Sequence, residues 1–439
     1  METQLERIAK VAKVNPKEKF TSLIHLINKE SLIESHKAMQ PGKASGVDKV
    51  TKEQYSEGLE ENIGDLLSRM KRQAYKPQPV RRTYINKEGS HKKRPLGIPA
   101  YEDKLVQSAL ARILNAIYEQ DFLECSFGFR PHRGCHDALQ LLDKIVNKDE
   151  IRFVVDADIK GFFDNVDHEK MMKFIDYRIE DKNLKRLIVR MLKAGIIEEG
   201  MKYETPKGTP QGGSASPIFG NIYLHYVIDI WYEKIVREHC QGNAYMVRYA
   251  DDAVFCFQYE EDAKRFYKSF VKRLGKYHLE VSEEKTKIIE LKKDGADDDN
   301  DHGDYTFDFL GFTHYMGKDK NGGKRVKRKT SKKKYRASLL RCKEWMRRNR
   351  MVPTKDFMHM IKLKIQGHCN YYGVTDNLRA VGNFIDECKR LIFKWLNRRS
   401  QQKSFDWDKF NLFLKKYPLP RAKTFVRIFD YGAGSSYLL

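Results

Sequence analysis

Two acidic segments, far apart in the 439-residue sequence, carry residue types suited to chemistry. In the first, an apolar run leads into Asp156 and Asp158; in the second, Asp251 and Asp252 stand side by side between two apolar runs. The second pattern predicts a β-hairpin with the adjacent acids at its turn. Burial raises the pKa of a carboxylate unless a cation neutralises it, so acids at the ends of apolar strands predict a divalent-metal site.

The chemistry that fits such a site is nucleotidyl transfer. Two Mg²⁺ ions held ~4 Å apart by shared carboxylates can activate a 3′-hydroxyl and stabilise a leaving pyrophosphate. We expect two Mg²⁺ ions here, with Mn²⁺ able to substitute. Taken alone, however, an Asp-Asp pair at a turn is explained more often by an ordinary hairpin than by a metal site, so the rest of the sequence has to decide.

The elements that position these acids belong to a strongly basic chain. Lys and Arg number 83 against 60 Asp and Glu, a net charge of +23, which predicts a nucleic-acid partner. On charge alone, a ribosome-associated or merely basic protein stays open. Seven cysteines without a CxxC pair argue against a disulfide framework and a structural zinc site. With no apolar run approaching the ~20 residues of a membrane span, we expect a cytoplasmic protein and no membrane contact.

The patterning divides the chain into four parts. Residues 1–70 are polar and helical; residues 71–315 mix strand-like and helical stretches, including a clear helix from Glu102 to Tyr118. Residues 316–405 form a basic helical domain, and 406–439 a short C-terminal segment. Because 16 Lys or Arg fall within 317–350, we interpret that helical domain as a surface for a nucleic-acid backbone; a solvated face or flexible tail is the alternative. The acidic stretch 292–304 is interpreted as a solvated loop, because the calcium-loop spacing fails at Phe309.

A resemblance decides between these alternatives. Tyr249-Ala250-Asp251-Asp252 looks like the YxDD box of reverse transcriptases, and its surroundings resemble the group II intron-encoded family. Residues 367–373 also resemble that family's thumb, or maturase, region. The blocks that match in the family's order are GVD at 46–48, RPLGIP at 94–99, SFGFRP at 126–131, the Asp158 block, GTPQGG at 208–213, YADD at 249–252, KTK at 285–287 and FLGF at 309–312.

The resemblance implies an α+β right-hand polymerase, in which fingers and a palm with an antiparallel sheet precede an α-helical thumb. It further implies that Asp158, Asp251 and Asp252 hold the catalytic metals, with the Ile159 carbonyl as a further ligand. Asp156 lies two residues from Asp158 and would share its face of a strand, so we interpret it as a supporting residue.

The same resemblance places the nucleotide. Lys87 and Arg94 match positions that neutralise the triphosphate, although Ile85-Asn86-Lys87 departs from the family's Ile-Pro-Lys and leaves that loop freer. Gln211 matches a residue that contacts the nucleotide. Phe163 matches an aromatic residue beneath the sugar, which predicts selection of dNTPs, and Phe162 is expected on the opposite, core-facing side of a strand.

The remaining matches concern the nucleic-acid strands. Phe309, Leu310 and Gly311 resemble the primer grip, although an ordinary strand turn with a glycine bulge explains them equally well in isolation. Arg130 and Arg133 are expected to contact template phosphates.

These residues predict an RNA-directed DNA polymerase that adds dNTPs to a DNA or RNA primer on an RNA template. We expect it to serve also as a maturase on structured group II intron RNA, without the HNH endonuclease of many relatives. Three alternatives stay open: a free-standing relative used in repair or phage defence, a non-catalytic RNA-binding splicing factor, and an RNA-dependent RNA polymerase. Phe163 argues against the last of these, and the intact acidic set against the splicing factor.

Overall fold

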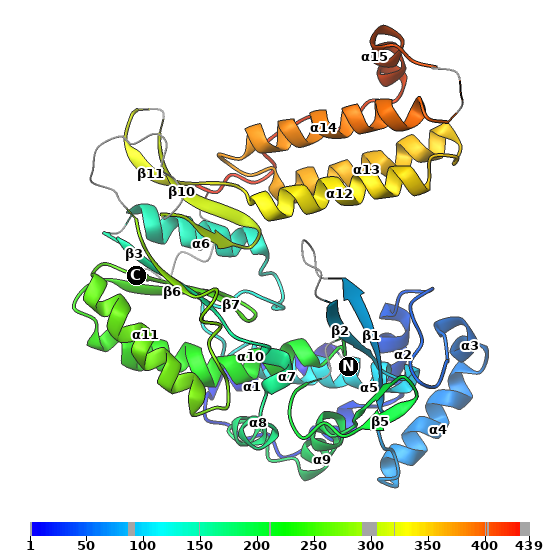
Figure 1. The fold of residues 1–439 in the computed structure, drawn as a ribbon. Coiled ribbons are helices and arrows are strands. Elements are labelled where there is room, and N and C mark those ends of the chain that lie inside the picture. Colours follow the sequence, from blue (N-terminus) through cyan, green and yellow to red (C-terminus); the bar gives the residue numbers. More distant parts are fainter. Residues whose placement is uncertain are drawn as a thin grey trace.

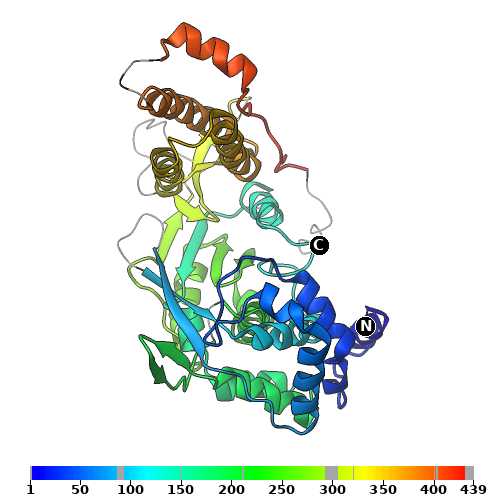
Figure 2. The same ribbon diagram turned by 90° about the vertical axis from the view of Figure 1, so that its right-hand side faces the viewer.

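The computed structural model describes residues 2–86, 93–148, 150–209, 212–291, 305–319, 321–399, 401 and 404–430. Sheets and helices alternate along the chain, so the expected α+β class is confirmed (Figure 1). A helical bundle forms one end of the molecule and the amino-terminal helices the other (Figure 2). The amino-terminal helices are α1 (Glu2–Val14), α2 (Lys29–Ala38), α3 (Lys52–Glu57) and α4 (Leu59–Lys71).

Helix α5 (Tyr101–Tyr118) organises the amino-terminal half. Its apolar residues recur at helical spacing and are buried, as the sequence predicted, and α1 and α2 pack against it. Beside it lies the fingers sheet, with strand order β2-β1-β4-β5. Its strands are β1 (Val80–Asn86), β2 (Lys93–Ile98), β4 (Ile196–Glu198) and β5 (Met201–Tyr203).

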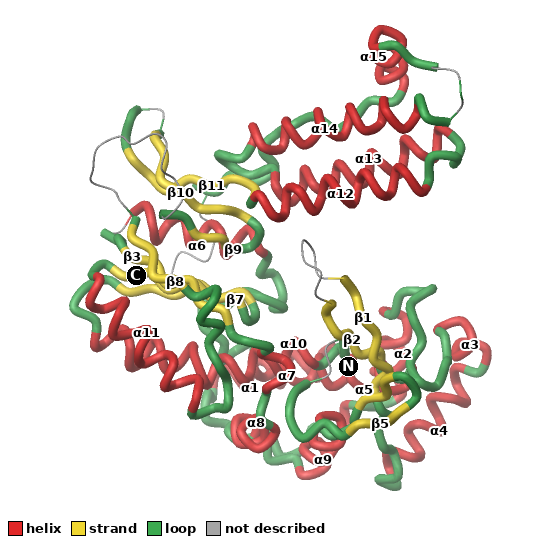
Figure 3. The backbone as a smooth tube through the Cα atoms, viewed as in Figure 1, coloured by secondary structure: helices red, strands yellow, loops and turns green. Residues whose placement is uncertain are grey.

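The palm sheet carries the acidic segments. Its strand order is β6-β7-β3-β8 and every neighbouring pair is antiparallel. The strands are β3 (Phe153–Asp158), β6 (Ala244–Tyr249), β7 (Asp252–Phe257) and β8 (Lys287–Glu290). Helix α11 (Glu260–Gly275) packs on β3 and β7, whereas α6 (Cys135–Lys148) packs on β6 (Figure 3).

Short helices join the fingers to the palm. They are α7 (Phe162–Asn165), α8 (His168–Ile175), α9 (Lys182–Leu192) and α10 (Ser216–Leu224). The chain then continues from α10 through π-helical turns at His225–Asp229 and Tyr232–Val236 and a 3₁₀ turn at Arg237–His239 before entering β6.

The thumb follows a second small antiparallel sheet, in the order β11-β10-β9. The strands are β9 (Phe307–Phe309), β10 (Phe312–Lys318) and β11 (Lys324–Thr330), and the helices are α12 (Lys332–Arg348), α13 (Thr354–Tyr372), α14 (Leu378–Leu396) and α15 (Trp407–Lys416). Helices α12, α13 and α14 pack on one another. The domain boundary expected between residues 315 and 316 falls inside β10. The basic residues that predicted a helical domain begin in the strands β10 and β11, which precede the thumb helices.

Buried apolar side chains of the described residues form two clusters that meet at the palm sheet. Val155 and Ala157 of β3 belong to the cluster with α5 and α11, while Val154 belongs to the cluster shared with the thumb helices. Successive strand residues face opposite sides, so β3 is a wall between the two cores. In the part of the chain described, no helix combines the length and the apolarity needed to cross a membrane, and the seven cysteines form no disulfide.

Candidate active site

The two acidic segments meet in the palm sheet. Asp158, the last residue of β3, stands directly opposite Asp252, the first residue of β7. Ala250 and Asp251 connect β6 to β7, and Ala250 takes a left-handed conformation with φ of 57°. The hairpin expected from the sequence is confirmed, and it brings three acids from two distant segments to one edge of the sheet.

A buried ion pair between Arg248 and Asp229 stabilises this hairpin. The Arg248 guanidinium donates to both carboxylate oxygens of Asp229, at 2.7 and 2.5 Å, and to the Ala250 carbonyl at 2.8 Å. Burial alone would raise the pKa of Asp229, but Arg248 outweighs it and the pKa lies below its ordinary value. The only sign of this pair in the sequence is an arginine inside an otherwise apolar strand, and no role was predicted for it.

A second cation, Lys285, pairs with one of the acids. Its ammonium forms an ion pair with the Asp158 carboxylate, and the Asp158 carbonyl accepts a hydrogen bond from the Ser282 amide at 2.8 Å. The Lys285 side chain is 55% exposed, so this cation is held loosely. Lys285 lies in the KTK block that carried the family resemblance, although no role was predicted for it.

Burial, followed by the charges of neighbouring carboxylates, raises the pKa values of the acids at this edge. Burial raises the pKa of Asp252 to about 7, helped by the charges of Asp251 and Asp158. Burial raises the pKa of Asp156 to about 7 as well, with Asp252 as the next cause. The pKa of Asp251 is also raised by burial and by Asp158, and Arg94 opposes that rise.

These donors fit a divalent cation. Carboxylate oxygens are the ligands that Mg²⁺ prefers, and a bound cation would stabilise the charged carboxylates against the burial and the mutual repulsion that raise their pKa values. The three acids do not form a preformed cluster: no group of three or more His, Cys, Asp or Glu within the described ranges is arranged to hold an ion. Ile159 follows β3 directly and forms an isolated antiparallel bridge with Val281.

Next to the acids lies the aromatic pair Phe162 and Phe163. The sequence placed it on a strand, and this was wrong: β3 ends at Asp158, Gly161 takes a left-handed conformation with φ of 56°, and Phe162 begins α7. Phe162 nevertheless faces the core, as expected, because it is buried, whereas Phe163 is only partly buried. The Phe163 carbonyl accepts from the Thr209 amide at 2.7 Å, which ties α7 to the GTPQGG segment.

The residues predicted to contact the nucleotide are only partly described. Arg94 is exposed on β2 and lies near enough to Asp251 to affect its pKa. Lys87, Gln211 and the loop 292–304 lie outside the described residues.

The two arginines predicted to contact the template differ from each other. Arg130 is buried, with a side chain 3% exposed, and donates to the Glu119 carboxylate and to the carbonyls of Leu123 and Ser126. A guanidinium with this many internal partners does not present a surface to a phosphate, so the structure does not support a template contact there. Arg133 pairs with Glu124 at 2.8 Å and is partly exposed.

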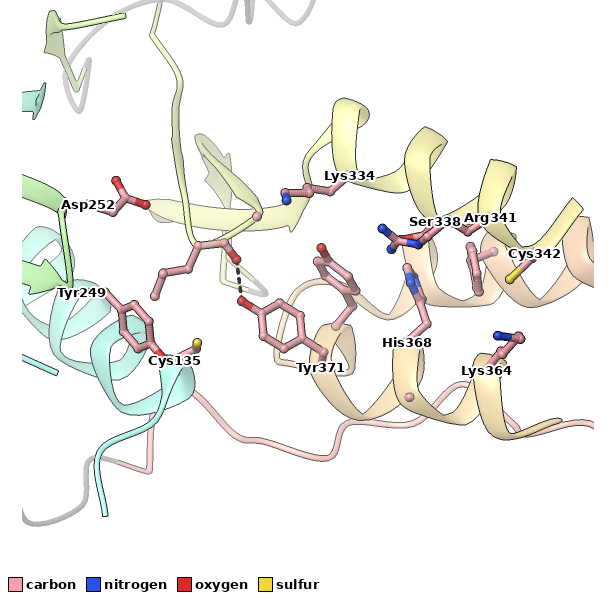
Figure 4. A pocket seen from close by; sticks show the side chains of 15 residues that line it. Cys135, Tyr249, Asp252, Lys334, Ser338, Arg341, Cys342, Lys364, His368 and Tyr371 are labelled. Atoms are coloured by element: carbon pink, nitrogen blue, oxygen red, sulfur yellow. Dashed lines mark hydrogen bonds between the residues drawn. The ribbon is translucent and has the colours of Figure 1, made fainter. Parts of the chain in front are cut away.

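A pocket of about 670 Å³ extends from Asp252 to the thumb (Figure 4). Asp252, Tyr249 and Cys135 lie at its palm end, and Leu310 and Gly311, from the turn between β9 and β10, form part of its wall. Its thumb side carries the cations Lys334, Arg341 and Lys364 and the remaining lining residues Ser338, Cys342, Gly367, His368, Tyr371, Tyr372 and Phe384.

An antiparallel sheet with acids at a hairpin turn, flanked by a fingers sheet and a helical bundle with a basic pocket, defines a hand-shaped, template-dependent polymerase. Comparison with known families agrees. Residues 85–314 match the model of reverse transcriptases (RNA-dependent DNA polymerases), and residues 326–413 match the maturase-specific domain of group II introns. The chain therefore belongs to the reverse transcriptase family, whose members use divalent metal ions.

Among curated proteins, the chain is 40% identical over 222 residues to the group II intron-encoded protein LtrA of Lactococcus lactis subsp. cremoris, a match covering 50% of this chain and 37% of LtrA. It is 34% identical over 282 residues to the protein YkfC of Escherichia coli (strain K12), covering 56% of this chain and 73% of YkfC. It is 38% identical over 176 residues to an uncharacterised 91 kDa protein in the cob intron of Schizosaccharomyces pombe, covering 40% and 21%. The chain thus spans little more than a third of the length of LtrA.

Proposed function

We propose that this protein is an RNA-directed DNA polymerase that adds dNTPs to the 3′-hydroxyl of a primer. The observation that carries the proposal is the placement of Asp158 opposite Asp252, with Asp251 beside them, at one end of a pocket with a basic wall. Excess negative charge beside a basic groove fits metal-dependent chemistry on a polyanion better than it fits a passive binding surface.

The metal ligands in this proposal are the carboxylates of Asp158, Asp251 and Asp252 and the carbonyl of Ile159, which would hold two Mg²⁺ ions. When bound, these ions supply Lewis acidity at the attacking and leaving oxygens. The Lys285 ammonium already on Asp158 indicates that this carboxylate binds cations readily.

The chain's own residues bind and orient the substrates. Arg94, together with Lys87, neutralises the triphosphate, and Gln211 contacts the nucleotide. Phe163 lies beneath the sugar, where a ribose 2′-hydroxyl would collide with its ring, so deoxynucleotides are selected. The thumb-side cations and Arg133 hold phosphates of the nucleic-acid strands.

Phe309, Leu310 and Gly311 act in this proposal as the primer grip. Phe309 is buried and anchors the turn, whereas Leu310 and Gly311 line the pocket that also contains Asp252. A primer strand lying in this pocket would have its 3′ end directed toward the acids.

We further propose that the RNA partner includes structured group II intron RNA, on which the protein acts as a maturase. Support comes from the match of residues 326–413 to the maturase-specific domain and from the intron-encoded relative LtrA. The domain division of 1–70, 71–315, 316–405 and 406–439 is retained as a proposal, with the first boundary of the thumb better placed after β11.

Primer extension tests the polymerase activity. Purified protein is given poly(rA)/oligo(dT), dTTP and Mg²⁺, and compared with a variant carrying Asp251→Ala and Asp252→Ala. The matched control is Glu60→Ala with Glu61→Ala, an adjacent acidic pair on the exposed first turn of α4. We expect synthesis by the wild type and the control and none by the Asp variant. A folded wild type that synthesises nothing would contradict the proposal.

A non-catalytic RNA-binding splicing factor is the second candidate, favoured by the maturase-domain match and the basic thumb. Its signature is assisted splicing of a group II intron RNA by a protein that extends no primer. If the Asp251, Asp252 variant still assists splicing while the wild type also extends primers, both functions reside in one chain. A free-standing relative used in repair or defence is distinguished by the absence of intron RNA domains around its gene.

A further inference from the structure

The turn between β9 and β10 has a conformation that its own residues do not favour. Leu310 has φ of 50° and Gly311 has φ of 80°, both in the left-handed region. Glycine adopts this region freely, but for leucine it costs about 1 kcal/mol or more. Because Leu310 is held there at the wall of the pocket, its surroundings must supply the stabilisation.

The stabilising contact comes from the thumb. Tyr371, near the end of α13, donates a hydrogen bond from its hydroxyl to the Leu310 carbonyl at 2.9 Å (Figure 4). The Tyr371 ring also stacks on Phe312, immediately after the turn, with ring centroids 5.9 Å apart and an interplanar angle of 23°. One thumb side chain therefore contacts both sides of the turn.

Tyr371 is itself fixed to the palm. Its backbone carbonyl accepts a hydrogen bond from Nε2 of His136 at 2.8 Å. Cys135, the first residue of α6, lines the same pocket as Tyr371 and Tyr249, lies between them in Figure 4 and contributes to the raised pKa of both hydroxyls. Tyr249 is the last residue of β6, directly before Ala250, Asp251 and Asp252. A row of neighbouring side chains therefore runs from the acidic hairpin through Cys135 and Tyr371 to Leu310.

We propose that Tyr371 is a positioning residue, which holds the Leu310-Gly311 turn in register with the acidic hairpin through its bond to the Leu310 carbonyl. This inference rests on the proposed polymerase function. The turn directs the primer terminus, and Tyr371 ties the turn to the same hairpin that carries Asp251 and Asp252. The duplex as a whole is held by a larger surface, so Tyr371 affects the placement of the 3′ end rather than the affinity for the primer–template.

The test is Tyr371→Phe, which keeps the ring on Phe312 and removes only the hydroxyl. The matched control is Tyr417→Phe, a tyrosine that follows α15 and packs on Phe413, remote from the pocket. Two quantities are measured for each protein: the single-turnover rate of dTTP incorporation on saturating poly(rA)/oligo(dT), and the Kd for that primer–template. We expect Tyr371→Phe to slow incorporation about three- to tenfold, the effect of one hydrogen bond, and to leave the Kd within twofold of wild type.

A structural readout accompanies the rate. Amide hydrogen exchange of the peptide that contains residues 307–313 should become faster in Tyr371→Phe and remain unchanged in Tyr417→Phe. Incorporation at the wild-type rate, or unchanged exchange at the turn, would overturn the inference. A wild type inactive on the same substrate would instead refute the proposed polymerase function, so the two failures are distinguishable.

A second pair of variants examines the link to the hairpin. Cys135→Ala removes the group between Tyr249 and Tyr371, whereas Cys135→Ser leaves a hydroxyl there. We expect Cys135→Ala to slow incorporation and Cys135→Ser to restore most of the rate, each without a change in Kd. Equal rates for the two variants would show that Tyr371 does not act through this contact.

Discussion

The Lys285 ammonium pairs with the carboxylate of Asp158, one of the three acids proposed to hold metal. Any divalent ion that binds Asp158 therefore competes with a cation supplied by the chain itself. Lys285 also opposes the rise in the pKa of Asp252, so its charge is part of the balance at this edge of the sheet.

Replacing Lys285 should allow Mg²⁺ to bind the acidic site at a lower concentration. Because the pair is about half exposed, its contribution is on the order of 0.2–1 kcal/mol, which corresponds to at most about fivefold in affinity. We expect Lys285→Met to lower the Mg²⁺ concentration for half-maximal primer extension by about two- to fivefold. Lys276→Met, an exposed lysine at the end of α11, is the charge-matched control and should leave it unchanged. A higher Mg²⁺ requirement would show that Lys285 assists the reaction rather than competing with the ion.

Gly311→Ala should impair both stability and extension. A Cβ there would lie 3.0 Å from the Tyr372 hydroxyl, and the backbone is left-handed. Gly322→Ala is a sharp control, since Gly322 is also left-handed, with φ of 85°, but has open space around it. The left-handed backbone should cost each variant about 1 kcal/mol of unfolding free energy. The close contact with Tyr372 should cost Gly311→Ala a further amount and should also make this variant extend primers poorly. Denaturant unfolding and primer extension measure the two effects, and equal behaviour of the two variants would contradict the prediction.

The thumb-side cations predict a salt-dependent affinity. Each phosphate contact removed should reduce the slope of log K against log salt concentration by about 0.7–0.9. We expect Arg341→Ala and Lys364→Ala each to weaken primer–template binding and to lower that slope, measured by fluorescence anisotropy at several salt concentrations. Lys409 lies on α15, pairs with Asp406 and does not line the pocket. Lys409→Ala should therefore change neither the affinity nor the slope. Equal slopes of log K against log salt concentration for the wild type and the two pocket variants would contradict phosphate contacts at Arg341 and Lys364.

His368 predicts an acid-sensitive thumb. Burial lowers its pKa to about 4, and its ring stacks on Phe384 with centroids 3.6 Å apart. Below the ordinary histidine pKa of about 6.5 the unfolded chain binds a proton that the folded chain excludes, so stability falls as pH falls from 6.5 toward 4. At pH 5 the loss is about 2 kcal/mol.

His368→Phe should therefore reduce the difference in Tm between pH 7 and pH 5, as measured by thermal unfolding. No described residue hydrogen-bonds Nε2 of His368, so the phenylalanine loses no such bond. His314 is also buried with a lowered pKa and remains in the variant, so part of the acid sensitivity should persist. An unchanged difference in Tm would exclude His368 as a source.

Local patterns were sufficient to predict the acidic hairpin and the long helix α5. Apolar runs on both sides of Asp251 and Asp252 specify two strands and a turn, and helical spacing specifies α5. The family resemblance then supplied the partner segment around Asp158, because spacing within one segment contains no information about which distant strand lies opposite. The register of β3 and β7 then places Asp158 directly opposite Asp252.

Contacts between distant residues were not predictable in the same way. Arg248 looked like one more basic residue, and only the fold shows it buried against Asp229. Arg130 matched a family block, yet Glu119, eleven residues earlier, occupies its guanidinium. The Phe162-Phe163 pair was misplaced on a strand because the apolar pattern does not reveal that β3 ends at Asp158 and that left-handed Gly161 precedes a short helix. The roles of Lys87 and Gln211 stay predictions.

The position of β3 between two cores has a genetic consequence. Val154 packs into the cluster shared with the thumb and Val155 into the cluster shared with α5, while Asp158 lies at the end of the same strand. Weakened packing in either half of the molecule is transmitted to the same carboxylates. In a selection for temperature-sensitive alleles, substitutions scattered through both halves should therefore share one phenotype, loss of the reaction at the restrictive temperature, however far from the acids they lie.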